Sequence, residues 1–239
     1  MITNYSPNFS TPSRNINKIK YIIFHYTGMR SQNEAINRLL NVKSKVSCHY
    51  FIKKNGKIIL MVPGNYEAWH AGKSNWKNDK SLNKSSIGIE ISNKGHDHGY
   101  EKFSNNQILS LIKLVKLLIK KYKINKKNIL GHSDISTERK KDPGEKFPWQ
   151  FLSKKGIGIW HNIDQTKLKK LRREKITVSE RSKGIKLLKN IGYFNNKLND
   201  KKHSKLIKSF QRRFRQELVD GIMDLECLII AEKLRKLYK

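Results

Sequence analysis

Apolar runs with two different periods alternate along the first two thirds of the chain, and this alternation constrains the fold most. Helix-type stripes, each opened by a Ser-x-x-Glu/Gln capping box, are predicted over residues 31–40 and 104–122. Strand-type runs are predicted at residues 19–26, 46–53, 57–62, 87–92 and 128–131. Asn55-Gly56 marks a hairpin between two of them. The order predicts an α/β domain, in which a central mixed β-sheet is flanked by helices.

Three side chains at or after these strands form a candidate metal site. His25 ends the first strand, His132 follows the last strand, and Asp142 lies in the loop beyond it. Strand ends hold side chains rigidly at an open sheet edge. Two imidazoles and one carboxylate make a three-ligand zinc set, which leaves a fourth position for water. Taken singly, each residue also has a structural interpretation: a hydrogen-bonded histidine near the core, or an aspartate that forms a turn before Pro143.

Two further charged residues are placed by the same kind of pattern. In IGIEI, the alternation puts Glu90 on the face opposite to the isoleucines. A carboxylate on a central strand is unfavourable unless it faces a polar cavity or has a partner, so Glu90 either serves a cleft or pairs with a lysine. Lys140 stands two residues before Asp142, so in an extended segment both side chains can point the same way. Charge alone does not distinguish Lys140 from Arg139 and Lys141.

An aromatic segment, AWHAGKSNW, supplies candidate substrate contacts. It contains Trp69, His70 and Trp76. Aromatic planes suit the apolar faces of sugar rings, although a tryptophan can equally belong to the core. His49, which follows Cys48, is a candidate either for the pocket or for a structural role.

Five segments of the chain, in this order, resemble the type-2 family of zinc-dependent N-acetylmuramoyl-L-alanine amidases. That fold is shared with phage-type lysozyme and the peptidoglycan recognition proteins. The segments are YIIFHYTGM, KVSCHYFIKKNGKIILMVP, AWHAGKSNW, SIGIEISN and GHSDISTERKKDPGEKFPW. The resemblance covers roughly residues 5–162. It implies one zinc ion per chain, held by His25, His132 and Asp142, and cleavage of the amide bond between the lactyl group of muramic acid and L-alanine.

The resemblance also assigns roles around the metal. It implies that Glu90 is the general base and that Lys140 stabilises the negative oxygen of the tetrahedral intermediate. It makes the AWHAGKSNW loop a wall of the substrate cleft, with His70 as a possible substrate contact. Phage-type relatives carry a catalytic tyrosine where this chain has Cys48. That departure favours the bacterial muropeptide-amidase arrangement, in which the glutamate acts.

The last third of the chain changes in character and predicts a second unit. After a basic linker, residues 163–178, come three helix-like stretches, the first of which ends at Gly192. The segments IGYFNN, IKSFQRRFR and VDGIMD resemble the three-helix peptidoglycan-binding domain often fused to these amidases. We therefore expect a catalytic domain over residues 1–162 and a small all-α domain over residues 179–239. The alternative is a helical extension that only braces the catalytic domain.

The formal net charge of +32 raises the question of a polyanionic partner. Because the basic residues are mostly lysines mixed with Asn and Ile along the whole chain, they predict unspecific attraction and no specific nucleic-acid partner. Peptidoglycan or a muropeptide is the expected substrate, and a monomer is expected. No apolar run is long enough to span a membrane. The N-terminus resembles neither a secretory signal nor a lipobox, which favours a cytoplasmic location over a periplasmic one.

Two other functions compete with the amidase. One is a non-catalytic peptidoglycan-recognition module of the same fold, in which the loss of a zinc ligand is common. The other is a zinc peptidase, which the missing HExxH helix disfavours. Because the three ligands stand beside Glu90 and Lys140, the sequence favours the enzyme.

Overall fold

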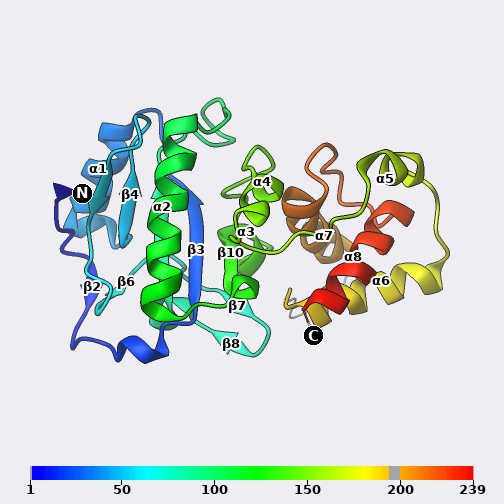
Figure 1. Ribbon diagram of the computed structural model, residues 1–239, viewed down its shortest axis with the longest axis horizontal. Coiled ribbons are helices and arrows are strands. Elements are labelled where there is room, and N and C mark those ends of the chain that lie inside the picture. Colours follow the sequence, from blue (N-terminus) through cyan, green and yellow to red (C-terminus); the bar gives the residue numbers. More distant parts are fainter. Residues whose placement is uncertain (1, 194–199, 239) are drawn as a thin grey trace.

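A six-stranded mixed sheet forms the centre of the computed structural model, which describes residues 2–193 and 200–238 (Figure 1). The strand order is β1-β5-β4-β9-β3-β10. These strands are β1 (Ile2–Thr3), β3 (Tyr21–Tyr26), β4 (Tyr50–Ile52), β5 (Ile58–Leu60), β9 (Ser86–Ile91) and β10 (Ile129–Gly131). β4 and β5 run antiparallel, whereas the other neighbouring pairs are parallel. The predicted mixed sheet with flanking helices is therefore confirmed.

Two helices cover opposite faces of this sheet. Phe51 of β4 packs in one cluster with the apolar side of α1 (Gln32–Leu40). Its neighbour Ile52 points the other way, into the larger cluster with α2 (Asn105–Tyr122). Successive side chains on a strand alternate between faces, so one strand serves both layers. The capping box predicted at the start of α2 is present.

The predicted hairpin is present, although its strands are shorter than expected. Gly56 has φ +83°, and a Cβ there would lie 2.6 Å from the carbonyl oxygen of Asn106. The amide of Lys53 bonds to the carbonyl of Lys57 at 2.9 Å, which closes the turn. His49, just before β4, still bonds through its amide to the carbonyl of Gly88 at 3.0 Å, whereas the amide of Ser47 bonds to the carbonyl of Trp69 at 3.1 Å, so the pairing with β9 ends between these two residues.

Several short elements carry too few residues for a periodic signal, and the sequence did not predict them. β2 pairs with β6, and β7 pairs with β8. Their bounds, together with those of two short helices, are β2 (Phe9–Ser10), β6 (Glu67–Ala68), β7 (Asn75–Trp76), β8 (Asp79–Lys80), α3 (His132–Ile135) and α4 (Trp149–Lys154).

The last third of the chain is helical, as expected. It contains α5 (Gln165–Leu171), α6 (Val178–Ile191), α7 (Asp200–Phe214) and α8 (Leu225–Leu237). The range predicted as a linker includes α5, whose Leu168 is buried, so this part of the chain packs against its neighbours. The last three residues of the IGYFNN segment lie outside the described residues.

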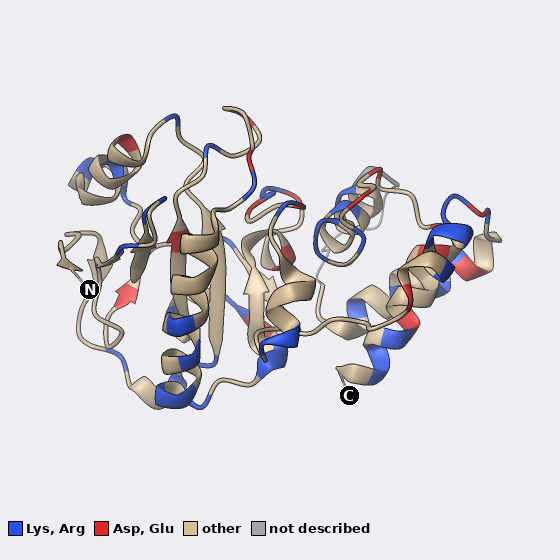
Figure 2. Cartoon of the chain, turned by 45° about the horizontal axis from the view of Figure 1, so that its top comes forward, with Lys and Arg blue, Asp and Glu red and all other residues tan. Residues whose placement is uncertain are grey.

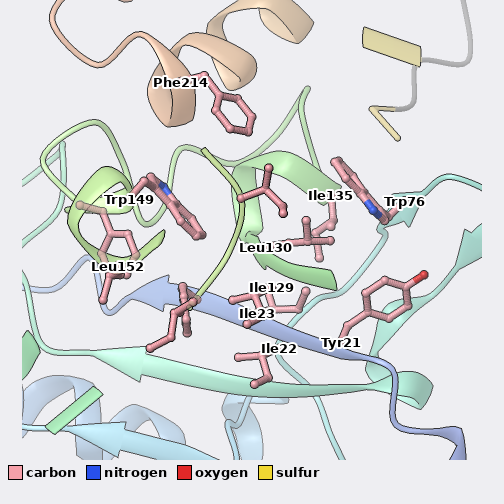
Figure 3. Packing of buried hydrophobic residues seen from close by; sticks show 14 of the residues in the cluster. Tyr21, Ile22, Ile23, Trp76, Ile129, Leu130, Ile135, Trp149, Leu152 and Phe214 are labelled. Carbon is pink, nitrogen blue, oxygen red and sulfur yellow. The ribbon is translucent and has the colours of Figure 1, made fainter. Parts of the chain in front are cut away.

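One hydrophobic cluster joins the sheet to the C-terminal helices. It includes Ile23 of β3, Trp149 of α4 and Phe214 of α7 (Figure 3). α7 contacts α3, and α6 contacts both α7 and α8. The helices therefore lie directly against the edge of the sheet formed by β10 and the segments that follow it (Figure 1).

Charge is not confined to one element. Figure 2 shows Lys and Arg on helices of the sheet region and of the C-terminal region alike. Over the described ranges, no helix has both the length and the apolar character that crossing a membrane requires.

Candidate metal centre

Three buried side chains converge at the edge of the sheet. His25 lies on β3, His132 opens α3 immediately after β10, and Asp142 lies in the loop beyond. The Nδ1 atoms of the two histidines are 2.9 Å apart, and each lies 3.0 Å from Oδ2 of Asp142. Within the described part of the chain, these residues form a group that could hold a metal ion.

The outer side of His132 faces a hydrogen-bond acceptor. Its Nε2 lies 3.1 Å from the carbonyl oxygen of Ala71, which can only accept a hydrogen bond. A proton on Nε2 satisfies this contact. In that tautomer Nδ1 carries the lone pair that a metal ion would bind.

A chain of three hydrogen bonds does the same for His25. The hydroxyl of Ser86 donates to the carbonyl of Leu82 at 2.6 Å, so its oxygen accepts from Nε2–H of His70 at 3.2 Å. Nδ1 of His70 then accepts from Nε2–H of His25 at 3.1 Å. Gly88 makes room for this ring, because a Cβ there would lie 2.3 Å from His70 Cγ. The Nδ1 atom of His25 is therefore left with a lone pair.

The donor set fits a divalent metal ion. The Nδ1 atoms of His25 and His132 and Oδ2 of Asp142 lie within 3.0 Å of one another, and two imidazole nitrogens with one carboxylate oxygen are ligands of the kind that zinc binds. Burial lowers the pKa of His25 to about 4, so its ring is neutral near pH 7. Although burial favours the neutral acid, His132 and His25 hold the pKa of Asp142 below its usual value. Neutral imidazole and ionised carboxylate are the forms that bind metals.

Glu90 lies beside this group and faces the same cleft. In the parallel pairing of β3 and β9 it stands opposite His25, on the α1 side of the sheet. It lines a cleft of about 590 Å³, and its Oε2 is buried without a hydrogen-bond partner among the described residues. Burial, and then the negative charge of Asp142, raise the pKa of Glu90 well above its usual value, whereas Lys140 lowers it. An unpaired acid with a raised pKa in a cleft is typical of a proton-transfer residue.

The three neighbouring cations near the cleft differ in their partners. Arg139 donates to the carbonyls of Ala71 and Lys73, so its guanidinium anchors the loop. Lys141 pairs with Asp97 at 3.7 Å. The charge of Lys140 instead acts on Glu90 and His25. Lys140 is thus the cation best placed to act within the site.

The predicted substrate contacts separate into two groups. Trp69 is partly exposed in the cleft, and its Nε1 donates to Ser10 at 2.8 Å. Trp76 is fully buried and packs edge-on against Tyr193, with ring centroids 5.1 Å apart. The substrate role predicted for Trp76 is therefore wrong, because the C-terminal segment covers its ring.

Two predicted histidine contacts are likewise engaged within the protein. His49 is fully buried; its Nδ1 accepts the amide proton of Gly88 at 2.9 Å, and its Nε2 lies 3.1 Å from the carbonyl of Tyr66. Both ring nitrogens of His70 are occupied by His25 and Ser86, although the ring also borders the cleft. His49 therefore holds a strand in place, and His70 orients the ring of His25.

Two residues that support His25 and His132 were not predicted from the sequence. Ser86 shares the face of Glu90 on β9, so the strand period carried a signal for it. Asp134 stands two residues after His132 and accepts the amide proton of Gly131 at 2.8 Å, as a residue in the first turn of a helix can do. Neither the strand period nor the helix-start pattern predicted the more distant residues that Ser86 and Asp134 contact.

The sequence is similar to known proteins over most of its length. The profile of the N-acetylmuramoyl-L-alanine amidase family matches residues 15–145. The N-acetylmuramoyl-L-alanine amidase AmiD of Escherichia coli is 34% identical over 235 residues, which cover 92% of this chain and 84% of that protein.

Solved structures agree with this similarity. The E. coli AmiD complex with the substrate anhydro-N-acetylmuramic acid-L-Ala-D-gamma-Glu-L-Lys superposes with a TM-score of 0.81 at 33% identity, and covers 96% of this chain and 92% of that one. AmpDh3 of Pseudomonas aeruginosa superposes with a TM-score of 0.82 at 29% identity, over 100% of this chain and 99% of that one.

Proposed function

Since this chain belongs to the N-acetylmuramoyl-L-alanine amidase family, we propose that it works with one zinc ion held by His25, His132 and Asp142. The enzyme hydrolyses the amide bond between the lactyl group of N-acetylmuramic acid, or its 1,6-anhydro form, and the L-alanine of the stem peptide. The observation that carries the zinc assignment is the convergence of two imidazole Nδ1 atoms and one carboxylate oxygen within 3.0 Å. Zinc prefers nitrogen and oxygen ligands of this kind.

The proposed roles of the other residues follow from their places in the cleft. When bound, zinc supplies a Lewis acid that polarises water and the substrate carbonyl. Glu90 accepts the proton of the attacking water at its unpaired Oε2 and returns a proton to the leaving amine. Lys140 supplies a positive charge beside the carbonyl oxygen as that oxygen becomes negative. The partly exposed ring of Trp69 offers a flat surface to the sugar.

The C-terminal helices raise a separate proposal. Residues 179–239 include α6, α7 and α8, the number of helices expected of the peptidoglycan-binding-like domain. We propose that they bind the wall polymer while α3, α4 and β10 share a core with them. The catalytic region over residues 1–162 is then not an independent unit in the folded chain, because its Trp76 and Trp149 are covered.

The test of this function uses purified full-length protein. We expect about one zinc per chain by elemental analysis. Incubation with anhydro-N-acetylmuramyl tripeptide should release the free tripeptide with an N-terminal L-alanine, detected by mass spectrometry. Removal of the metal with a chelator should abolish this release, and added zinc should restore it. Full activity in protein shown to be free of metal would overturn the zinc assignment.

A further inference from the structure

Asp134 is a buried carboxylate that accepts hydrogen bonds from its own helix start and from the C-terminal region. It is 1% exposed. Its Oδ2 accepts from the amide of Gly131 at 2.8 Å and from Nη1 of Arg213 at 2.6 Å. Its Oδ1 accepts from the hydroxyl of Tyr193 at 2.7 Å. Arg213 lies on α7 and Tyr193 follows α6, so two of the three donors come from the C-terminal region.

Arg213 is held in a fixed position. Its side chain is 1% exposed, and Nη2 donates to the carbonyl of Ile129 on β10 at 3.1 Å. The guanidinium lies over the ring of Trp149, 4.2 Å from the centroid, and near Phe214 (Figure 3 shows both rings between the sheet and α7). Taking such a pair out of water is expensive, and well-packed apolar residues often give equal stability. A buried pair at this place therefore suggests a role in fixing local geometry.

Two of the proposed metal ligands, His132 and Asp142, are connected to the backbone next to Asp134. Gly131, which Asp134 bonds, directly precedes His132. The amide of the next residue, Ser133, donates to the carbonyl of Asp142 at 2.8 Å. The two ligand segments are thus joined to each other by a backbone bond and joined to the C-terminal helices through Asp134.

We propose that Arg213 and Tyr193 are positioning residues for the metal centre: by fixing Asp134, the C-terminal helices set the placement of His132 and Asp142. This inference rests on the proposed zinc site. Groups that orient metal ligands from outside typically change metal affinity by about 10–100-fold when they are removed. The free energy of metal binding then depends in part on α7, a helix that supplies no ligand.

A second buried arginine supplies a matched control. Arg215, two residues further along the chain, is 3% exposed and pairs with Asp220 at 2.7 Å and with Asp224. These partners belong to the C-terminal region itself. Replacing Arg215 therefore disturbs a buried ion pair of the same kind without touching Asp134.

The experiment compares metal affinity in full-length variants. Zinc affinity is measured by competition with a chromophoric chelator, and cobalt(II) absorption reports the ligand geometry, at a temperature where circular dichroism shows each variant folded. We expect Arg213→Met to weaken zinc binding about 10–100-fold and to change the cobalt spectrum, and Tyr193→Phe to weaken zinc binding by a smaller factor. Arg215→Met should lower the melting temperature and leave both metal readouts unchanged.

Because Arg213→Met leaves an uncompensated carboxylate, the double variant Asp134→Asn/Arg213→Met provides a folded alternative, and it should show the same loss of zinc affinity. Wild-type zinc affinity and an unchanged cobalt spectrum in this double variant and in Tyr193→Phe would overturn the inference. Equal weakening by Arg215→Met would also overturn it, because a general loss of stability would then explain the effect. Absence of zinc from the wild-type protein would instead contradict the proposed function.

Discussion

Arginines in and beside the C-terminal helices are paired with carboxylates, whereas an acid at the edge of the sheet is not paired. Among the helices, Arg215 lies 2.7 Å from Asp220, and Arg172 lies 2.7 Å from Glu226. At the sheet edge, by contrast, Asp142 meets the Nδ1 atoms of two imidazoles, and Oε2 of Glu90 has no hydrogen-bond partner within the part of the chain that the structure describes. The charges of the first region are therefore complete without a ligand, and those of the second are not.

Buried charges that lack a protein partner indicate a functional site more clearly than paired ones do. A buried charge with its partner in place is compensated within the protein, although such a pair often adds no net stability. A buried group whose natural partner is not a protein atom marks a site that a ligand completes. The metal centre is incomplete in this sense, and the helices that pack beside it are complete.

The strongest test of the contrast removes a ligand from the incomplete region. We expect His25→Ala, His132→Ala or Asp142→Ala each to lose bound zinc and all measurable hydrolysis, because two ligands bind the ion far more weakly than three. His98→Ala is the control, since this exposed histidine also lines the cleft. Zinc content and release of the stem peptide are measured in parallel. A ligand variant that retains full zinc content would show that the metal lies elsewhere.

Removal of the unpaired acid should give the next largest effect. Glu90→Gln should keep its zinc and bind muropeptide normally while kcat falls about 10²–10⁴-fold, because only the proton acceptor is lost. Glu34→Gln, an exposed acid on α1 that also lines the cleft, should behave like the wild type. The measurement is single-turnover kinetics with a soluble muropeptide. A normal kcat in Glu90→Gln would mean that Glu90 is structural.

The cation beside Glu90 should affect both the rate and the pH profile. We expect Lys140→Met to lower kcat about a hundredfold. Since Lys140 lowers the pKa of Glu90, its loss should raise that pKa and move the acidic limb of the kcat/KM profile to higher pH, where the carboxyl becomes ionised. Lys141→Met, which breaks only the contact with Asp97, should leave the limb in place. An acidic limb that moves to lower pH in Lys140→Met would contradict the assigned electrostatics.

A smaller effect on zinc affinity is expected when the hydrogen bonds that orient His25 are removed. Ser86→Ala removes the acceptor that fixes the proton of His70, so the lone pair of His25 is no longer directed at the metal. We expect zinc affinity to fall about tenfold while the fold is retained. Ser6→Ala is the control. Ser6 is also buried and donates to the carbonyl of Leu39, so its hydrogen bond is not part of the chain that orients His25. This variant should bind zinc as the wild type does. Identical affinities in the two variants would show that the chain of bonds has no influence on the metal.

The ligands and the sheet could be predicted because their signals are local. His25 and Glu90 stand on strands with a clear period of two, and the segments around His132 and Asp142 resemble a family as written. What failed depended on partners distant in the sequence. Trp76 looked like a sugar contact because nothing near it in the sequence reveals that Tyr193 covers its ring.

The same reason hid the bond between the two regions. Arg213 reads as one basic residue in a very basic helix, and its partner lies 79 positions away. The two-residue strands β2 and β6 were missed for a different reason, because so short a pair has no period. Sequence periodicity therefore identifies the longer elements, and the family resemblance identifies residues that the structure brings together, whereas packing between distant segments has to come from the structure.

The C-terminal helices, whose buried arginines are paired, can also be tested for a binding function of their own. If residues 179–239 bind the wall polymer, the full-length protein should stay on insoluble peptidoglycan at about 1 M salt, where the Debye length is about 3 Å and unspecific attraction by the net charge of +32 is screened. The Glu90→Gln variant should be used, so that the polymer is not digested during the assay, and the retained fraction measured by sedimentation. A charge-matched lysine-rich protein should be released at that salt, and only a modest retained excess is expected, since one small domain supplies it. Complete release of the full-length protein would leave the helices with a bracing role alone, because they would then act through Asp134 and the shared core without holding substrate.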